Sequence, residues 1–263
     1  MDQIVFSKFL LENTYLVNVF QNNELVSQGS AFPINSNGDL ITAAHVITGR
    51  LPYKPKDVQN LTILCRKPGD PFDNYTCNLL APNFSLPQLK DPIFIDAAIL
   101  VNQNRGKNVS FFKTSDSNIE EGRNVLMCGY SDEVDFPLSF NKNIDLTHPD
   151  FKGAEEGIKF AFEAWMKLNM VKSGMIGRAF KINIKNLNNI TGYSIYIDNG
   201  IHSGASGGPV INAEKEVIGI ITQRAITSYS TSKNPGLSVP SGSTIAISPN
   251  LILEAANIKG IKL

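Results

Sequence analysis

The stretch Ser203-Gly204-Ala205-Ser206-Gly207-Gly208-Pro209-Val210 places a serine inside a glycine-rich turn, just ahead of the apolar run 217–221. Glycine adopts backbone conformations that other residues avoid, so the chain can turn sharply here and leave the Ser206 hydroxyl exposed. Such a turn also lets two amide N–H groups point at one position, which is how an oxyanion site is built beside a nucleophile. Since a Ser-Gly-Gly turn by itself is typical of an ordinary loop, its meaning depends on the rest of the chain.

Two other sites give the turn a chemical meaning: Thr42-Ala43-Ala44-His45 upstream, and Asp96 with apolar residues on both sides. A serine hydroxyl needs a base within hydrogen-bond reach, and imidazole suits that role near neutral pH. An isolated carboxylate at position 96 would be costly to desolvate, whereas a bond to the His45 ring N–H would stabilise it. The order His45, Asp96, Ser206 is one known chain order of the acyl-transfer triad, so we expect these three to be catalytic.

The alternatives to these residues are weaker. His148 lies in a polar Thr-His-Pro segment typical of a surface loop, and Asp91 precedes a proline in a polar loop. His202, four residues before Ser206, is interpreted either as a turn residue or as a residue that lines the substrate cleft.

Composition limits the classes of function. The chain has 263 residues, enough for one or two domains with a sizeable core, with 42% hydrophobic and 18% charged residues. Its formal net charge is zero, so nothing favours a nucleic acid or an anionic membrane as partner. The start of the chain has no basic segment followed by a long apolar stretch, and the three cysteines fit a reducing compartment, so we expect a cytoplasmic protein.

Short apolar runs broken by Gly, Pro, Asn and Asp make up most of the chain, which predicts an all-β protein. The clearest of them are 15–20, 39–41, 61–64, 97–101, 124–129, 194–197 and 217–222. Cys65 and Cys77 flank the turn signal 68–71 and would face one another in a symmetric hairpin; without a visible leader we interpret them as two reduced thiols on neighbouring strands.

These motifs resemble the trypsin-like (chymotrypsin-fold) serine peptidases, and most closely the bacterial, HtrA-like and trypsin-like peptidase domain branch. The resemblance spans residues 15–255 and is carried by 29–34 with 38–46, by 96–100, by the Ser206 turn, and by 219–222 with 242–250. It implies two packed six-stranded β-barrels with the active site in the cleft between them. The first barrel, 1–110, would carry His45 and Asp96; the second, 111–263, would carry Ser206.

Three segments need their own interpretation. Residues 41–47 are expected to form a short helical turn carrying His45, and 249–258 a terminal helix with Ser248 as its cap and Pro249 in its first position. Residues 155–172 match both strand and helix periods, and we interpret them as strands with an irregular bend. Residues 131–153 are expected to form a surface loop, and 103–122 a linker.

The resemblance implies roles for further residues. The backbone N–H groups of Gly204 and Ser206 would form the oxyanion hole. In digestive members an aspartate at the position of Ala205 pairs with a freshly cut N-terminus; because Ala205 cannot, we expect no activation of that type. The pocket for the residue before the scissile bond would include Gly200 at its base, with His202 as a further candidate and with walls from Thr222, Gln223, Arg224 and Gly242.

Without an acid at its base, that pocket predicts a small or medium uncharged side chain, or an acidic one if Arg224 faces the cleft rather than solvent. No metal-ligand spacing and no phosphate-binding glycine loop occurs, so we expect no metal and no cofactor. The sequence therefore predicts a serine endopeptidase acting on proteins or peptides, with a regulatory protein partner as a further expectation. The alternative is a silent fold that binds a protein; an esterase of the α/β-hydrolase type does not match the strand-rich pattern.

Overall fold

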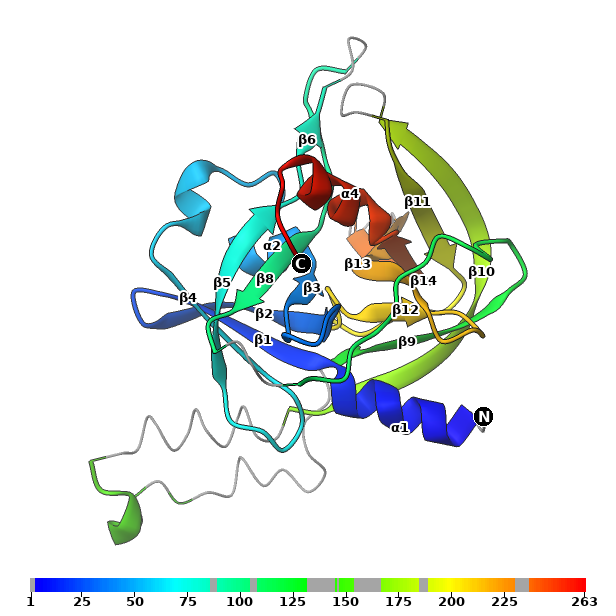
Figure 1. The fold of residues 1–263 in the computed structure, drawn as a ribbon. Coiled ribbons are helices and arrows are strands. Elements are labelled where there is room, and N and C mark those ends of the chain that lie inside the picture. The colour runs from blue at the N-terminus through cyan, green and yellow to red at the C-terminus, as the bar shows by residue number, and fades with distance from the viewer. Residues whose placement is uncertain are drawn as a thin grey trace.

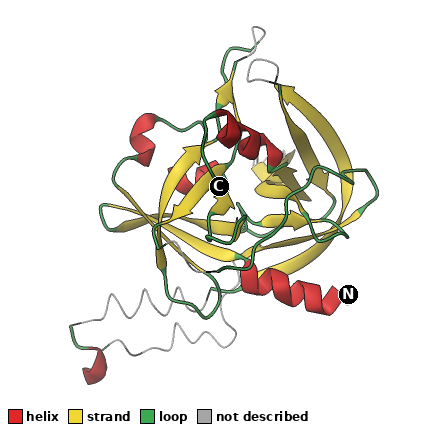
Figure 2. Cartoon of the chain, viewed as in Figure 1, coloured by secondary structure: helices red, strands yellow, loops and turns green. Residues whose placement is uncertain are grey.

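Two closed antiparallel barrels of six strands each, with a helix near either end of the chain, make up the fold (Figures 1 and 2). This computed structural model describes residues 3–85, 89–104, 108–131, 145, 147–153, 167–184, 189–229 and 237–263. The strand orders are β1-β2-β3-β8-β5-β4 in the first barrel and β10-β11-β14-β13-β12-β9 in the second. The expected all-β, chymotrypsin-like double barrel is confirmed.

The first barrel is formed within residues 15–102. A separate hairpin, β6 (Asn83–Phe84) with β7 (Ile93–Phe94), projects from it, and two short helices follow β3, namely α2 (Ala44–Thr48) and the 3-10 helix η1 (Pro55–Val58). The barrel strands are β1 (Tyr15–Gln21), β2 (Glu24–Pro33), β3 (Leu40–Thr42), β4 (Leu61–Arg66), β5 (Asp73–Leu80) and β8 (Ala98–Asn102).

The second barrel is formed within residues 124–247, and the terminal helix α4 (Asn250–Ile258) packs on its strand β11. A short 3-10 helix, η3 (Pro149–Phe151), precedes β10. The strands are β9 (Asn124–Tyr130), β10 (Asn169–Ile184), β11 (Ile190–Ile197), β12 (Pro209–Ile211), β13 (Val217–Tyr229) and β14 (Leu237–Ile247).

Buried side chains form one core inside each barrel and a third core that joins the barrels. Phe32 and Ile41 of the first barrel meet Cys128 and Ile220 of the second in this joining core. Burying apolar surface between the barrels holds them together at about 25 cal/mol per Å² removed from water. The cleft between the barrels is therefore bordered by a packed interface.

The N-terminal helix α1 (Gln3–Asn13) was not anticipated from the sequence. Phe6 and Leu10 bury one face, but Ile4 and Val5 are exposed, so no apolar stripe with a helical period marks the segment. Asn169 Nδ2 of β10 donates to Leu11 O at 2.6 Å, which attaches the helix to the second barrel. In the part of the chain that the structure describes, this and every other helix is too short or too polar to cross a membrane.

Both helical segments expected from the sequence, 41–47 and 249–258, can be compared with the structure. At the first, the chain stays extended to Thr42, because Thr42 pairs with Ala31 of β2 and with Ala98 of β8, and the helix begins only at Ala44. The terminal helix ends at Ile258 as expected but begins one residue later, at Asn250, so that Pro249 is its N-cap rather than its first residue. Ser248, the expected cap, lies one residue further out, and its Oγ accepts from the backbone N–H of Asn250 at 3.2 Å.

For 155–172, only 167–172 are described, and β10 begins at Asn169; the remainder, and most of 131–153, lie outside the described residues.

The three cysteines are free thiols. Cys65 is paired with Asp73 across the β4–β5 hairpin, whereas Cys77 is paired with Leu100 of β8, so the two thiols are not opposite one another. The hairpin is centred at Gly69, two residues before the centre that the symmetric arrangement required. Burial raises the pKa of Cys77 to about 11 and that of Cys128 to about 12, which keeps both thiols protonated at neutral pH.

Candidate active site

Asp96 makes two hydrogen bonds to His45. Its Oδ2 lies 2.7 Å from His45 Nδ1, and its Oδ1 accepts from the His45 backbone N–H at 3.0 Å. A carboxylate only accepts, so the proton of the neutral ring lies on Nδ1 and the lone pair on Nε2. The side chain of His45 is 30% exposed and that of Asp96 13%, so the ring has access to the cleft while the carboxylate is largely shielded.

The strand register explains why these two residues meet although 51 positions separate them. Thr42 at the end of β3 is paired with Ala98 at the start of β8. His45 therefore lies three residues beyond one partner, and Asp96 two residues before the other, at the same end of the strand pair. Helix α2 then carries His45, and Gly49 ends it in the left-handed conformation, which glycine adopts without steric cost.

Ser206 lies in a turn whose backbone is tightly held. Gly207 N donates to Ile221 O at 2.7 Å, and Gly208 N donates to Ala205 O at 2.9 Å. Gly207 has a φ of 86°, and a Cβ there would lie 2.1 Å from Ser30 O. Only glycine fits such a position, because the conformation is strained for L side chains and the space is occupied.

The Ser206 hydroxyl donates to the carbonyl of Thr222 at 3.4 Å, a long hydrogen bond. Among the hydrogen bonds between described residues, none joins this hydroxyl to His45, and none uses the N–H of Gly204 or Ser206. These two N–H groups are therefore available to an acceptor that enters the cleft.

His45 and Ser206 line one cavity of about 380 Å³, to which the first barrel contributes His45 and the second barrel the remaining wall. Four of the expected substrate-binding residues line it, namely His202, Thr222, Gln223 and Arg224. Sequence reasoning missed the other wall residues, Ile201, Ser203, Ile221 and Ile226. Their closeness to Ser206 and to Thr222 along the chain was the available signal.

Gly200 and Gly242 are not among the residues that line this cavity. They lie against each other instead, since a Cβ on Gly200 would lie 3.2 Å from the Gly242 carbonyl carbon. The segment 199–201 is held from outside the cavity: Lys172 Nζ donates to Gly200 O at 2.5 Å, and Thr244 Oγ1 both donates to Asn199 O at 2.7 Å and accepts from Ile201 N at 2.9 Å.

Ala205 is fully buried, and its side chain lies where Gly129 of β9 leaves space: a Cβ at Gly129 would come within 2.6 Å of it. His202 Nε2 lies 3.0 Å from Met170 Sδ of β10. The turn before Ser206 thus packs closely on the second barrel without a carboxylate at position 205.

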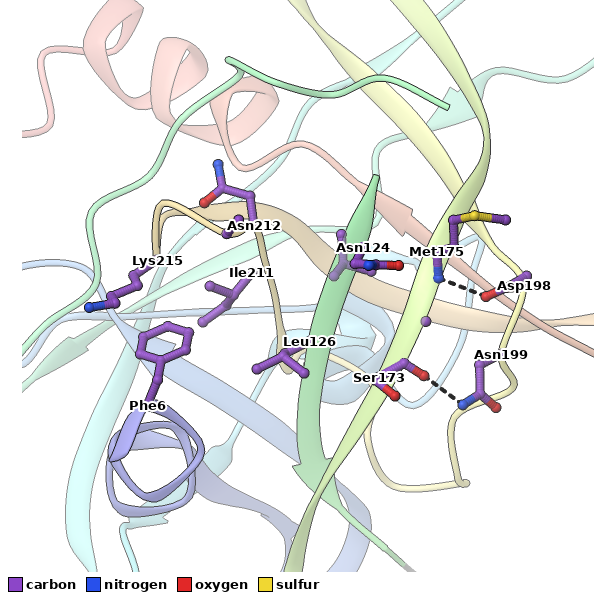
Figure 3. Close-up of a pocket in the computed structure, with 13 residues that line it drawn as sticks. Phe6, Asn124, Leu126, Ser173, Met175, Asp198, Asn199, Ile211, Asn212 and Lys215 are labelled. Atoms are coloured by element: carbon purple, nitrogen blue, oxygen red, sulfur yellow. Dashed lines mark hydrogen bonds between the residues drawn. The ribbon is translucent and has the colours of Figure 1, made fainter. Parts of the chain in front are cut away.

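A second groove, of about 870 Å³, lies between α1, β9 and β10 (Figure 3). It contains none of the three expected catalytic residues. Asp198 and Asn199 at its edge bond to β10, through Asp198 Oδ1 to Met175 N at 2.7 Å and Asn199 Nδ2 to Ser173 O at 2.7 Å. Among the described residues, no group of three or more His, Cys, Asp or Glu side chains is arranged to hold a metal ion.

A sequence model of the family described as trypsin-like peptidase domain matches residues 29–220, well over half of the chain. The chain belongs to this family. The match includes the His45 segment, Asp96 and the Ser206 turn, so the resemblance drawn from the motifs is confirmed for the trypsin-like peptidase family as a whole. A search of curated proteins found no match.

Solved structures support the fold of this trypsin-like domain. One is the Rv3671c protease in an inactive form, with a TM-score of 0.57 and 14% identity over 98% of this chain and 96% of that one. Another is a serine-to-alanine mutant of Rv3671c from M. tuberculosis H37Rv, also inactive, with a TM-score of 0.54 and 14% identity over 100% and 96% of the two chains. At this identity the likeness concerns the fold.

Proposed function

We propose that this protein is a serine endopeptidase that uses Ser206 as nucleophile, His45 as general base and Asp96 as the residue that orients the imidazole. The observation that carries the proposal is the pair of hydrogen bonds that Asp96 accepts from His45, together with the cavity that His45 and Ser206 both line. A carboxylate that bonds both the ring and the backbone N–H fixes the position of the imidazole as well as its tautomer.

The reaction follows from this arrangement. Before attack, the Ser206 hydroxyl turns from the Thr222 carbonyl toward His45, and Nε2 takes its proton as Oγ bonds to the substrate carbonyl carbon. The N–H groups of Gly204 and Ser206 bind the oxyanion that develops. His45 then gives the proton to the leaving amine, and a water molecule, deprotonated by the same ring, releases the acyl group from Ser206.

We propose a small or medium uncharged side chain before the scissile bond, because Ile201, Ile221 and Ile226 supply apolar wall to the cavity. An acidic side chain is the second candidate, since His202 and Arg224 line the same cavity. A cleavage profile of a peptide library dominated by Arg or Lys would contradict both preferences.

The second candidate function is a protein-binding module that keeps the fold without catalysis. It is favoured by the Ser206 hydroxyl, which bonds the Thr222 carbonyl rather than His45. In this alternative the cleft holds a peptide segment that is never cut.

Labelling with a fluorescent fluorophosphonate separates the two candidates, because the reagent reacts only with an activated serine. We expect the wild type to be labelled and Ser206→Ala not to be. Ser241→Ala is the matched control, since Ser241 is exposed and its hydroxyl donates to Ala225 O at 3.1 Å, away from His45 and Asp96. Absence of labelling in the folded wild type would favour the binding module.

A further inference from the structure

We propose that Ser30, in strand β2 of the first barrel, is a positioning residue that holds the Ser206 turn at a set place relative to His45. The proposal rests on the serine peptidase function proposed above and adds a residue to it. Ser30 lies 176 positions before the nucleophile and is fully buried, so it does not reach the substrate itself.

Ser30 makes two hydrogen bonds to the Ser206 turn. Its backbone N–H donates to Ser206 O at 2.8 Å, and its hydroxyl donates to Gly204 O at 3.0 Å. Gly204 and Ser206 are the two residues whose N–H groups face the proposed oxyanion. The fixed Gly204 and Ser206 carbonyls flank the peptide 205–206, which carries the Ser206 N–H, and so restrict its rotation directly; the Gly204 N–H, one peptide further on, is restricted from one side.

The Ser30 hydroxyl is also an acceptor. It takes a hydrogen bond at 2.8 Å from the backbone N–H of Tyr130, at the end of β9 in the second barrel. A hydroxyl has one hydrogen to donate, and here it is used on Gly204 O while a lone pair is used on Tyr130 N. One buried side chain therefore joins the first barrel, the second barrel and the turn.

Strands β2 and β3 also connect Ser30 to His45, the proposed general base. The Ser30 carbonyl accepts from Thr42 Oγ1 at 2.7 Å, and Thr42, three residues before His45, is paired with Ala31 next to Ser30. The nucleophile turn is thus bonded to the strands from which the His45 helix begins. Since a misplacement of about 1 Å can lower a rate on the order of 10²-fold, this connection matters for proton transfer.

Two features of the turn agree with this role. A Cβ at Gly207 would lie 2.1 Å from Ser30 O, which shows how closely the turn approaches Ser30. Ala205 carries no carboxylate that a cut N-terminus could bind, so the turn needs another source of order. Ser30 supplies it from within the chain, in a form that requires no proteolytic cut.

The test measures fluorophosphonate labelling of Ser206 over a range of reagent concentrations, in wild type, Ser30→Ala and Ser30→Cys. For Ser30→Ala we expect a maximal labelling rate lower on the order of 10²-fold, as for a misplaced reacting group, with the half-saturating concentration changed less than about twofold. Ser30→Cys keeps a weak donor and acceptor, so its rate should lie between the other two. The fraction of protein finally labelled should stay unchanged.

Ser248→Ala is the matched control, because Ser248 is equally buried and its hydroxyl bonds Asp116 in another part of the molecule. It should lose thermal stability but keep the wild-type labelling rate. If Ser30→Ala labels at the wild-type rate, or loses only the final labelled fraction, Ser30 has a folding role alone and the proposal is overturned. Failure of the wild type to label would overturn the proposed peptidase function, and this proposal with it.

Discussion

The two barrels hold their parts of the candidate site in different ways. In the first barrel a side chain holds a side chain: the Asp96 carboxylate bonds the His45 ring at 2.7 Å and its backbone N–H at 3.0 Å. In the second barrel it is the backbone of the turn that is held: Gly207 N donates to Ile221 O, and Ser206 O accepts from Ser30 N. The Ser206 hydroxyl itself makes a long hydrogen bond to the Thr222 carbonyl.

This difference predicts which substitutions each part of the candidate site tolerates. The His45 part depends on one carboxylate whose chemistry is irreplaceable but whose loss leaves the backbone intact. The Ser206 part depends on several hydrogen bonds to main-chain atoms of the turn, so substitutions around it, Ser30→Ala included, should act through the position and order of the turn, whereas only substitution of Ser206 removes the nucleophile itself. Substitutions in the first part should act on turnover, and substitutions around the turn on shape and stability together.

Asp96→Asn should have the largest effect. Its amide N–H₂ can donate to Nδ1, which would leave the ring proton on Nε2, where the base is needed. We expect labelling of Ser206 or peptide turnover to fall on the order of 10⁴-fold with little loss of folding stability. Thermal unfolding of Asp96→Asn and wild type, measured side by side, checks that the stability is nearly unchanged. If the loss of activity is explained by a lower unfolding temperature, the contrast between the two barrels is contradicted.

Thr244→Val should have an intermediate effect, on stability and on peptide binding, in the part of the candidate site that the second barrel carries. Valine has the shape of threonine but leaves Asn199 O and Ile201 N without the bonds that Thr244 Oγ1 makes, at a cost of about 1–3 kcal/mol in the free energy of unfolding. Because Ile201 lines the cavity, the concentration of peptide needed for half-maximal turnover should rise more than the maximal rate falls. Denaturant unfolding and steady-state kinetics measure the two effects.

Thr14→Val provides the control for that substitution. Thr14 is also fully buried, and its hydroxyl bonds Leu10 O at 2.8 Å at the end of α1. It should lose stability to a similar degree while peptide binding stays as in the wild type. Equal kinetic effects of the two substitutions would contradict the role of Thr244 in holding the cavity wall through Ile201.

Asp116→Asn should have the smallest effect and leave activity unchanged. Burial, followed by the nearby charge of Glu254, raises the pKa of Asp116 above its ordinary value, while hydrogen bonds from Ser248 and Asn250 oppose the rise. A raised carboxyl pKa stabilises the fold below the unfolded-state value near 3.8, and this stability is lost as pH rises through the folded-state pKa. The wild type should therefore lose stability relative to Asp116→Asn as pH rises above the unfolded-state value of 3.8, in thermal unfolding followed from acid to neutral pH. A constant difference would show that this carboxyl does not contribute to the pH dependence.

Much of the architecture followed from local pattern. Short apolar runs and turn residues predicted the strands, and the family resemblance carried by the motifs around His45, Asp96 and Ser206 implied the double barrel. Helix α1 was missed because apolar residues lie on both of its faces. The interpretation of Cys65 and Cys77 as two reduced thiols on neighbouring strands is confirmed, while the symmetric hairpin that would set them face to face is absent because the turn is centred at Gly69 rather than at Pro71. The expected roles of Gly200 and Gly242 in the substrate pocket stay predictions, although neither lines the cavity.

By itself the sequence determined which chemical groups are present, in what order, and where the backbone must turn: an imidazole after one strand, a carboxylate before another, and a serine among glycines. Only the tertiary structure decided what holds them. The bond from Ser30 to Gly204 joins residues 174 positions apart, and the Thr244 hydroxyl bridges a segment 43 to 45 positions before it. Local patterns record that a side chain is buried, but a hydrogen-bond partner is chosen by strand register and barrel packing, which form only when distant segments meet.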